Sequence, residues 1–431
     1  MGHELNAAAI AVVSACVLIW GLVSARLERW DVTAPIAFLV LGLVAANGPL
    51  AVIHLNLHSS DIRSLAEITL ALVLFADASR VNVKALGADL SLPSRLLGIG
   101  LPLTIGAGTA LAAGLFTGAG WWLAALLGAI VAPTDAALGA SIVQNERVPA
   151  AVRRALNVES GLNDGIATPF VNLFLAGALA SEAVRGGGAG SAAIDLLGGA
   201  ALGAGIGLLG AVLLSWTGRT GWSAAAFRPL AVVALAIFAY ATALVADING
   251  FVAAFIAGMA FGTVVADDEL LVFAEEAGTL MSLLVWFLFG AVMVVPGFEA
   301  AGWRDAIFAV LALTAVRMGP VALALSGAGF DKATVGFIGW FGPRGLASVV
   351  FGLIAIDSLA PADARLVLGA VTVTVTLSVI AHGISGSPLA QLYGRRAQRL
   401  QQGRPEHAPT NVLPARRLAR GLHALGRGRW R

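Results

Sequence analysis

The chain has 431 residues, of which 58% are hydrophobic and 12% are charged, and its formal net charge is +2. Soluble domains carry about 25% charged residues, so this composition excludes an ordinary soluble globule of this length. Long uncharged stretches, such as residues 7–23, 34–50 and 97–116, approach or reach the roughly 20 residues that cross a bilayer. The sequence therefore predicts an all-α membrane protein with many spans.

Breaks in the hydropathy pattern predict about thirteen transmembrane helices joined by short loops. In chain order, the expected ranges are 6–25, 34–52, 61–78, 94–116, 120–143, 151–181, 191–217, 229–246, 249–266, 277–296, 304–327, 333–356 and 366–390. The organisation that follows is one transmembrane domain over residues 1–393 and a basic tail over 394–431, which we expect to be disordered.

Lysine and arginine concentrate in alternate loops of this arrangement, and cytoplasmic loops carry such an excess. The pattern predicts a multi-pass protein of the cell membrane with the N-terminus outside and the tail in the cytoplasm. The tail carries ten arginines and one acid, Glu406, so we expect it to lie on anionic membrane lipid. It lacks interleaved aromatic residues and a nucleic-acid-binding fold, so no nucleic-acid partner is expected.

The first polar motif inside a predicted span is Pro133-Thr134-Asp135. Proline removes a backbone donor and clashes with the preceding turn, so we expect the helix to break here. Carbonyl groups freed by such a break can coordinate a cation, and Asp135 would add a hard oxygen ligand and a proton acceptor. The structural alternative is that Asp135 neutralises the exposed amides of a helix N-terminus at the break.

The second motif reads ESGLND and lies in the next predicted span. Ser160 and Asp164 are four residues apart and share a helix face, and Asn163 lies between the directions of Glu159 and Ser160. Two carboxylates, an amide and a hydroxyl at this spacing suit a hard alkali cation, which prefers oxygen ligands. A purely structural polar network is the alternative.

Two arginines, Arg317 and Arg344, also fall inside predicted spans. A guanidinium buried in a membrane needs a partner, so we expect one arginine to pair with a carboxylate of the two motifs. Arg344 follows Pro343, which predicts a second broken helix. Pro133 and Pro343 occupy corresponding positions in the two halves of the chain, as in two inverted repeats. Paired interrupted helices of this kind point to a transporter site where they cross.

A family resemblance extends these expectations. The stretches ALVLFADAS, APTDAAL, ESGLNDG, NGFVAAFIAG and GPRGLAS occur in this order. In sequence and spacing they resemble the monovalent cation:proton antiporters, specifically the sodium/proton exchanger branch. The resemblance covers nearly the whole chain, up to about residue 390. It implies thirteen helices divided into a dimerisation domain and a six-helix core, and hence a homodimer.

The resemblance also implies roles for the polar residues of the two motifs. Asp164 resembles the main carboxylate for ion and proton. Asp135 and Asn163 resemble the pair that bridges the site beside the crossed, unwound helices. Ser160 and the backbone of Thr134 resemble further ligands, so an alkali cation is expected at Asp164, Ser160 and Thr134.

Three further residues are assigned by resemblance to supporting roles. Glu159 resembles the family's salt-bridge partner of an arginine, and Arg317 is the first choice for that arginine, with Arg344 as the rival. The third span departs from the family pattern, because many members have a glutamate beside Phe75 where this chain has alanine and then Asp77. Asp77 is a candidate replacement one position later.

The expected activity is exchange of Na⁺, or of K⁺ or Li⁺, for H⁺, without a cofactor. Burial disfavours an ionised carboxylate, whereas a cation favours it, so proton and cation would compete for Asp164. The neighbour of Asp164 is Asn163 and not a second acid, which favours one proton per cation and electroneutral exchange. The alternatives are a passive cation channel and a sodium-coupled solute symporter. A membrane hydrolase is disfavoured, because no histidine lies near Ser160 in sequence.

Overall fold

The structure is a computed structural model that describes residues 7–53, 55–80, 91–135, 137–139, 142, 145–182, 189–265, 268–401 and 403–408. In these ranges every regular element is a helix. The first half of the chain forms α1 (Ala7–Leu27), η1 (Glu28–Trp30), α2 (Ala34–Ala46), η2 (Gly48–Leu50), α3 (Ser60–Ser79), α5 (Ser91–Arg95), η3 (Leu96–Gly100), α6 (Leu101–Leu115), α7 (Trp121–Ile130), α9 (Ala150–Glu182) and α10 (Ala189–Arg219). The second half forms α11 (Arg228–Val245), α12 (Gly250–Val264), α13 (Asp268–Leu288), η4 (Phe289–Met293), α14 (Val294–Ala300), α15 (Trp303–Leu313), α16 (Ala315–Ala324), α17 (Lys332–Trp340), α18 (Leu346–Ser358), α19 (Pro361–Ala397) and η5 (Pro405–His407).

The predicted all-α membrane fold is confirmed, and every predicted range contains at least one described helix, although in the range 120–143 that helix, α7, ends at Ile130. The count of thirteen spans stays a prediction. Among the described residues, eight helices are long and apolar enough to cross a membrane, and α2, α7, α12 and α18 are shorter apolar helices. The predicted range 34–52 was too long, because Gly48 adopts a φ of 76° and a proline follows it. Glycine at positive φ followed by proline ends a helix. The inverted repeats stay a prediction.

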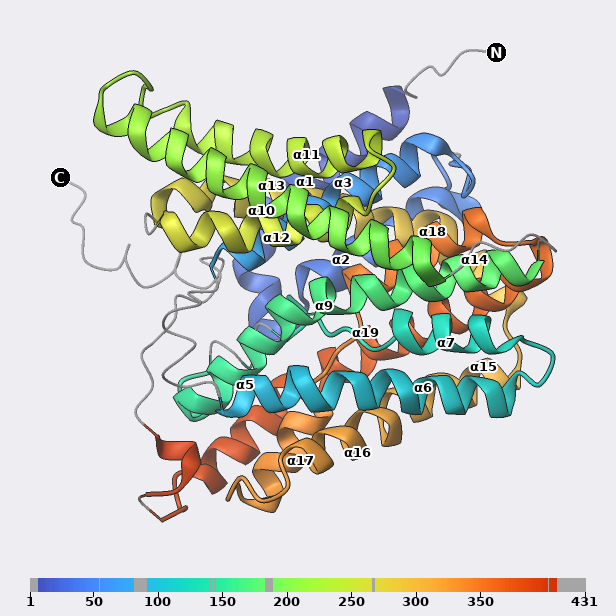
Figure 1. Cartoon of the computed structure of the whole chain (residues 1–431). Coiled ribbons are helices and arrows are strands. Elements are labelled where there is room, and N and C mark those ends of the chain that lie inside the picture. The colour runs from blue at the N-terminus through green and yellow to red at the C-terminus, as the bar shows by residue number, and fades with distance from the viewer. Residues whose placement is uncertain are drawn as a thin grey trace.

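One group of helices consists of α3 and α10–α13, with α12 between α10 and α3 (Figure 1). Glycines of α10 allow this close approach. A Cβ atom on Gly203 or Gly207 would lie 2.3 Å from the carbonyl oxygen of Ala253 or Ala257, respectively. Small residues at such spacing let two membrane helices pack backbone to backbone. The glycines of α10 therefore set the distance between α10 and α12.

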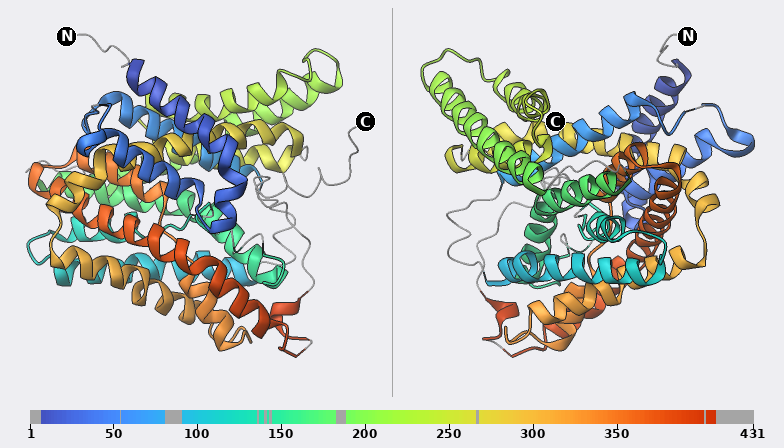
Figure 2. Two further views of the ribbon diagram at one scale, coloured as in Figure 1. Left: turned by 180° about the vertical axis from the view of Figure 1, so that it is seen from behind. Right: turned by 45° about the vertical axis from the view of Figure 1, so that its right-hand side comes forward.

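A second group contains α6, α7, α9 and α15–α19, with α6 packed against both α7 and α16. Figure 2 shows α10 and α11 at the edge of the molecule, away from α16 and α17. Two broken helices belong to this second group. α7 ends at Ile130, and α17 and α18 are separated by residues 341–345.

The C-terminal segment packs against the start of α17. α19 continues to Ala397, and the side chain of Glu406 is only 1% exposed. Glu406 Oε1 accepts hydrogen bonds from the backbone N–H of Asp331, at 2.7 Å, and from Thr334 Oγ1, at 2.8 Å. The described part of the predicted tail is therefore packed onto the membrane domain. Residue 402 and residues 409–431 lie outside the described residues.

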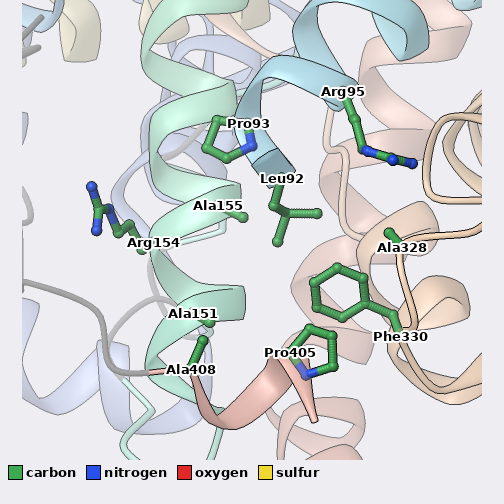
Figure 3. A pocket seen from close by; sticks show the side chains of 10 residues that line it. All are labelled: Leu92, Pro93, Arg95, Ala151, Arg154, Ala155, Ala328, Phe330, Pro405 and Ala408. Atoms are coloured by element: carbon green, nitrogen blue, oxygen red, sulfur yellow. The ribbon is translucent and has the colours of Figure 1, made fainter. Parts of the chain in front are cut away.

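A cavity of about 310 Å³ lies where this segment meets α5 and α9 (Figure 3). Pro405 lines it from the C-terminal side. Arg95 donates hydrogen bonds to the carbonyl oxygens of Ala324, at 3.3 Å, and Ser326, at 2.9 Å. The side chain of Arg154 points away from the cavity. Arg95 therefore ties α5 to the end of α16.

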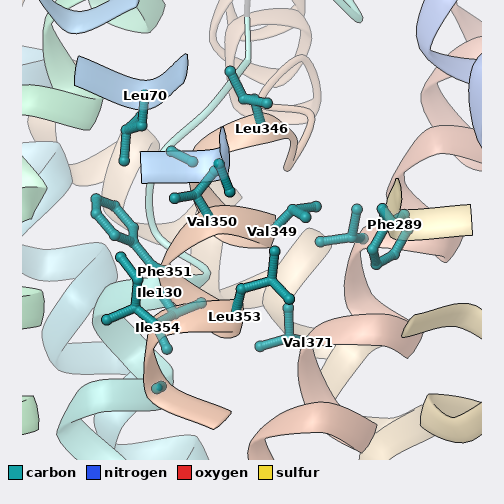
Figure 4. Close-up of a cluster of buried hydrophobic side chains, with 14 of the residues drawn as sticks. Leu70, Ile130, Phe289, Leu346, Val349, Val350, Phe351, Leu353, Ile354 and Val371 are labelled. Carbon is teal, nitrogen blue, oxygen red and sulfur yellow. The ribbon is translucent and has the colours of Figure 1, made fainter. Parts of the chain in front are cut away.

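α18 lies at the centre of the protein. Every residue from Leu346 to Ile356 is buried, as expected for a helix that is apolar all round. Figure 4 shows the side chains that surround it, which come from α3, α7, η4 and α19. The N-terminus of this rigid central helix faces the break in α7, where the polar residues gather.

Candidate functional site

The two proline breaks meet each other. Residues 131–135 follow α7 in a non-helical conformation, and the backbone N–H of Asp135 donates to the carbonyl oxygen of Pro343 at 2.7 Å. Proline interrupts the pattern of helical hydrogen bonds in both segments. One orphan donor of the first break is therefore paired with an orphan acceptor of the second. The site is built on this crossing.

The Asp135 carboxylate binds backbone amides at the crossing. Its Oδ2 accepts from the N–H of Leu346 at 3.0 Å, and its Oδ1 accepts from the N–H of Ala137 at 2.7 Å. Leu346 is the first residue of α18, so a negative charge here also faces the positive end of the helix. Gly345 permits the approach, because a Cβ atom on it would lie 2.1 Å from Asp135 Oδ2. Asp135 thus binds helix N-terminal amides, as in the structural reading of the sequence, and its part in binding cation or proton stays a prediction.

Arg344 binds carbonyl oxygens at the α7 break and in α15. Its side chain is fully buried, and one terminal nitrogen donates to the carbonyls of Ala132, at 2.6 Å, and Pro133, at 3.3 Å. The other terminal nitrogen donates to Ala312 at 3.3 Å. The sequence predicted that carbonyls freed by the break would be open to a cation. At these two carbonyls the arginine supplies the positive charge in this structure, and coordination of a cation by the break stays a prediction.

The polar face of α9 lies against Thr134. The Thr134 hydroxyl is 3.1 Å from Ser160 Oγ, and it accepts a 2.6 Å hydrogen bond from Asn163 Nδ2. Asn163 is 1% exposed, and within the described part of the chain its Oδ1 has no hydrogen-bond partner. Asp164 is also buried. No hydrogen bond joins Asp135 to Asn163 in the described structure, where the Asn163 amide donates to Thr134 and the Asp135 carboxylate accepts from backbone amides.

A small cavity of about 10 Å³ opens beside these groups. Asp135 and Ser160 line it together with Leu156 and Phe341. A cavity of this volume accommodates about one water-sized particle. The crossing therefore has side-chain oxygen atoms beside a cavity large enough for one water molecule or one small ion.

Glu159 and Arg317 form a bidentate ion pair. The two Arg317 terminal nitrogens lie 2.5 and 2.8 Å from the two Glu159 carboxylate oxygens, and the side chains are both 2% exposed. Arg317 also lies under the second break, since a Cβ atom on Gly342 would be 2.5 Å from its Nε. Of the two buried arginines, Arg317 therefore pairs with a carboxylate, whereas Arg344 binds backbone carbonyl oxygens.

Asp77 of α3 lies across from the ESGLND motif. A Cβ atom added to Gly161 would be 3.8 Å from Asp77 Cβ, and Asp77 is partly buried. The structure thus places this acid against α9, on the side that faces the α3 group of helices.

Sequence reasoning missed a stripe of α19 that holds the second break. Ser378 Oγ accepts from the backbone N–H of Arg344 at 2.7 Å, His382 Nε2 lies 2.9 Å from the Trp340 carbonyl, and the Trp340 indole donates to Ser385 at 2.9 Å. These three α19 residues are spaced i, i+4, i+7 and share a face. The available signal was His382 itself, because an ionisable residue inside an apolar span points to a functional site.

Comparisons with known proteins agree with this arrangement. The family model described as "Sodium/hydrogen exchanger, transmembrane" matches residues 12–392. The K(+)/H(+) antiporter NhaP of Alkalimonas amylolytica is 29% identical over 398 residues, which cover 90% of this chain and 67% of that protein.

Two structures of the sodium proton antiporter MjNhaP1 from Methanocaldococcus jannaschii show a similar fold, each with a TM-score of 0.70. They are 20% and 17% identical to this chain, and they cover 89% and 92% of it and 98% and 99% of their own chains. The relatives are transporters and not enzymes. The family model spans residues 12–392 of the 431 residues, so this chain is a multi-pass membrane protein that belongs to the sodium/hydrogen exchanger family, a family of cation–proton antiporters.

Proposed function

We propose that the protein exchanges Na⁺ or K⁺ for H⁺ across the cell membrane, and that cation and proton compete for Asp164. The observation that carries the proposal is the burial of Asp164 one turn after Ser160, whose hydroxyl meets Thr134 at the crossing of two broken helices. Burial in a low-dielectric interior disfavours the ionised form of a carboxylate. A bound proton or a bound cation removes that cost, and only one of them fits at a time.

The proposed cation ligands are Asp164, Ser160 and Thr134, since hard cations prefer oxygen. The buried Oδ1 of Asn163 is a further acceptor, for the ion or for its water, because no hydrogen bond within the described residues engages it. Asp135 holds the crossing together, because its carboxylate accepts from the Leu346 amide of α18 and its backbone N–H donates to the Pro343 carbonyl of the second break. The relatives' printed names mention both potassium and sodium, so both ions are retained as substrates.

The site supports electroneutral exchange. On the polar face of α9, Glu159 is neutralised by Arg317, and Asn163 carries no charge. We therefore assign the titrating role in this motif to Asp164. One proton per monovalent cation moves no net charge. We further propose a homodimer with the N-terminus outside and the C-terminus in the cytoplasm, in keeping with the distribution of basic residues.

Everted membrane vesicles containing a pH-sensitive dye test the exchange directly. The vesicles are first acidified, and Na⁺, K⁺ or Li⁺ is then added in turn. An antiporter releases the fluorescence quench on addition of its own cation, and an outward cation gradient drives proton uptake in the reverse direction. A passive channel would show no obligatory coupling between the two gradients. A symporter would respond to cation only in the presence of its solute.

Substituting Asn163 with aspartate is expected to make exchange sensitive to membrane potential. The new carboxylate would lie beside Thr134 and Asp164, adding a second proton site on the same helix face. Rates are measured in proteoliposomes at several potentials clamped with K⁺ and valinomycin, with Na⁺ as the transported ion. Wild-type exchange should be independent of the potential. An Asn163→Asp protein that transports but ignores the potential would contradict the stoichiometry proposed here.

Substituting His382 with alanine is expected to raise the cation concentration for half-maximal exchange about tenfold, the equivalent of ~1.4 kcal/mol, as for one lost buried hydrogen bond. The bond at risk joins His382 to the Trp340 carbonyl, at the end of α17. The residues that follow, 341–346, bind Asp135 through the Pro343 carbonyl and the Leu346 amide. If these residues are held less firmly, the affinity for the cation should fall, and the maximal rate should change less than the affinity does.

Ser385→Ala is the matched control for this experiment, because it removes only the indole bond of Trp340 and leaves the backbone of the break intact. His382→Gln should restore part of the affinity, since its amide can donate to the same carbonyl. Equal effects of the alanine substitutions at His382 and Ser385 would argue for general packing along α19 and against a specific hold on the break.

A further inference from the structure

An apolar groove runs between α17 and α19. It has a volume of about 380 Å³, and its lining comes from the outward side of α17 and the last turns of α19. The nine lining residues are Ala333, Gly336, Phe337, Trp340, Phe341, Leu389, Leu392, Tyr393 and Arg396. Eight of them are uncharged. The ninth, Arg396, lies where the first turn of α17 meets the last turn of α19.

The groove has a rigid aromatic floor and an open wall. The rings of Phe337 and Tyr393 stack with centroids 4.2 Å apart and planes inclined by 20°. No atom lies within 4 Å of the position where Gly336 would carry a Cβ. From Ala333 to Trp340 the helical rise amounts to about 10 Å. This length suits a segment of an extended hydrocarbon chain.

The groove opens onto a face of α19 that is apolar and exposed in the protein. Ile380, Ile384 and Leu392 on this helix are 52%, 73% and 65% exposed. Large apolar side chains exposed along a membrane helix contact lipid. The groove is therefore accessible from the bilayer, and its inner end lies beside Trp340 and Phe341, next to the second break.

The outer end of the groove is basic. Arg396 is 59% exposed, and its one hydrogen bond within the described residues uses Nε, which leaves its two terminal nitrogens available. The exposed residues Lys332, Arg395 and Arg399 lie at the same ends of α17 and α19.

Both acids at this end, Glu406 and Asp331, are already engaged, and Glu406 accepts from the Asp331 amide and the Thr334 hydroxyl. Burial raises the pKa of Asp331, but the hydrogen bond from the Ala333 amide, the bond to Arg396 and the nearby charge of Arg404 outweigh it and hold the pKa below its usual range. Asp331 therefore stays ionised at neutral pH, and the four exposed basic residues Lys332, Arg395, Arg396 and Arg399 still outnumber Asp331 and Glu406. The net potential at the mouth of the groove favours an anion.

We propose that this groove binds an anionic phospholipid of the membrane, with its phosphate at Arg396 and one acyl chain along Phe337 and Trp340. The charge pattern carries the choice of ligand, because a basic mouth at the interface and an apolar interior match a phospholipid from end to end. Basic pockets between membrane helices bind such headgroups. The proposal stands apart from the exchange mechanism and does not depend on it.

The test uses the full-length protein, delipidated in neutral detergent and titrated by native mass spectrometry with phosphatidylglycerol and phosphatidylcholine of identical acyl chains. We expect tighter binding of phosphatidylglycerol in the first binding event. Arg396→Ala should weaken that event about fivefold, as expected for one interfacial basic residue, without affecting phosphatidylcholine. Gly336→Leu should weaken both lipids by filling the groove.

Two variants control for loss of charge and for added bulk elsewhere. Arg29→Ala removes an exposed arginine after α1, and Gly106→Leu adds the same side chain at another helical glycine with open space around it. Both should bind phosphatidylglycerol as the wild type does. Equal affinity for the two lipids, or wild-type binding by Gly336→Leu, would overturn the proposal. So would displacement of the lipid by glycerol 3-phosphate alone at matching concentration.

A fluorescence measurement covers the case in which a groove variant fails to fold. Brominated acyl chains quench nearby tryptophan, so brominated phosphatidylglycerol should quench the wild type more than Trp340→Phe. Equal quenching of these two proteins would show that no chain lies at Trp340 and would refute the assignment of the groove.

Discussion

Replacing Asp164 by asparagine is expected to reduce cation–proton exchange to the background of vesicles without the protein. Asparagine keeps the volume and hydrogen-bonding capacity of the side chain but cannot release a proton or balance the charge of a cation. Asp164 is buried next to the crossing of the broken helices, so no solvent charge can replace it. Exchange is measured by dye dequenching, and amount and folding by membrane content and melting temperature.

The variant should remain folded, because a buried carboxylate becomes less costly when it is neutralised. Asp247→Asn is the matched control. Asp247 is exposed in the turn before α12 and has a φ of 53°, which asparagine also tolerates. Full exchange by Asp164→Asn would disprove the assignment of the carrier carboxylate, while a dead Asp247→Asn would show that the assay reports expression and not chemistry.

Breaking the pair between Glu159 and Arg317 is expected to lower the free energy of unfolding by about 3–5 kcal/mol. Both side chains are 2% exposed and are joined by two hydrogen bonds. Glu159→Gln or Arg317→Ala removes one charge and leaves the other uncompensated in a low-dielectric interior. Expression and melting temperature in detergent should both fall, and the fall should exceed that caused by Asp164→Asn.

An exposed ion pair of the same protein provides the comparison. Arg396 and Asp331 are 59% and 18% exposed and 3.2 Å apart, and exposed pairs contribute about 0–1 kcal/mol. Arg396→Ala should therefore leave the melting temperature near that of the wild type. If Glu159→Gln is equally harmless, the buried pair does not hold the core together. A charge-exchanged double variant at 159 and 317 that regains stability would show that the pair itself matters.

The two breaks illustrate what local sequence can predict. Pro133 and Pro343 lack a backbone donor, so a discontinuity at each follows from the residue alone. α7 ends at Ile130, and residues 341–345 separate α17 from α18. The hydrogen bond from the Asp135 amide to the Pro343 carbonyl could not be predicted, because it joins two segments more than two hundred positions apart.

The number of charged residues does not by itself predict which partners the two buried arginines take. The sequence offered two buried guanidinium groups and three carboxylates, and it preferred Arg317 for Glu159 only through family resemblance. Arg344 found a different kind of partner, the carbonyl oxygens of Ala132, Pro133 and Ala312. Backbone carbonyls become acceptors only where a helix is interrupted and another helix brings a donor within reach. The pattern of side chains in the sequence does not predict such a contact.

His382 and Ser378 were overlooked for the same reason. Both sit in an apolar span of ordinary appearance, and their importance lies in the Trp340 carbonyl and the Arg344 amide that they meet. The described start of the predicted tail likewise packs down because Glu406 finds the first turn of α17. In both cases a single polar side chain satisfies backbone groups of a remote helix end.

The sequence by itself determined that the protein is a helical membrane protein, where most helices lie, which helices break, and that Ser160 and Asp164 share one face of α9. These features follow from hydrophobic length, backbone chemistry and helical periodicity, all of which act over a few residues. Only the tertiary structure decided that Thr134 joins Ser160 to Asn163, and that Asp135 and Arg344 bind backbone groups at the crossing. Those partners are set by packing between distant segments, where each buried polar group must pair with whatever the neighbouring helix presents.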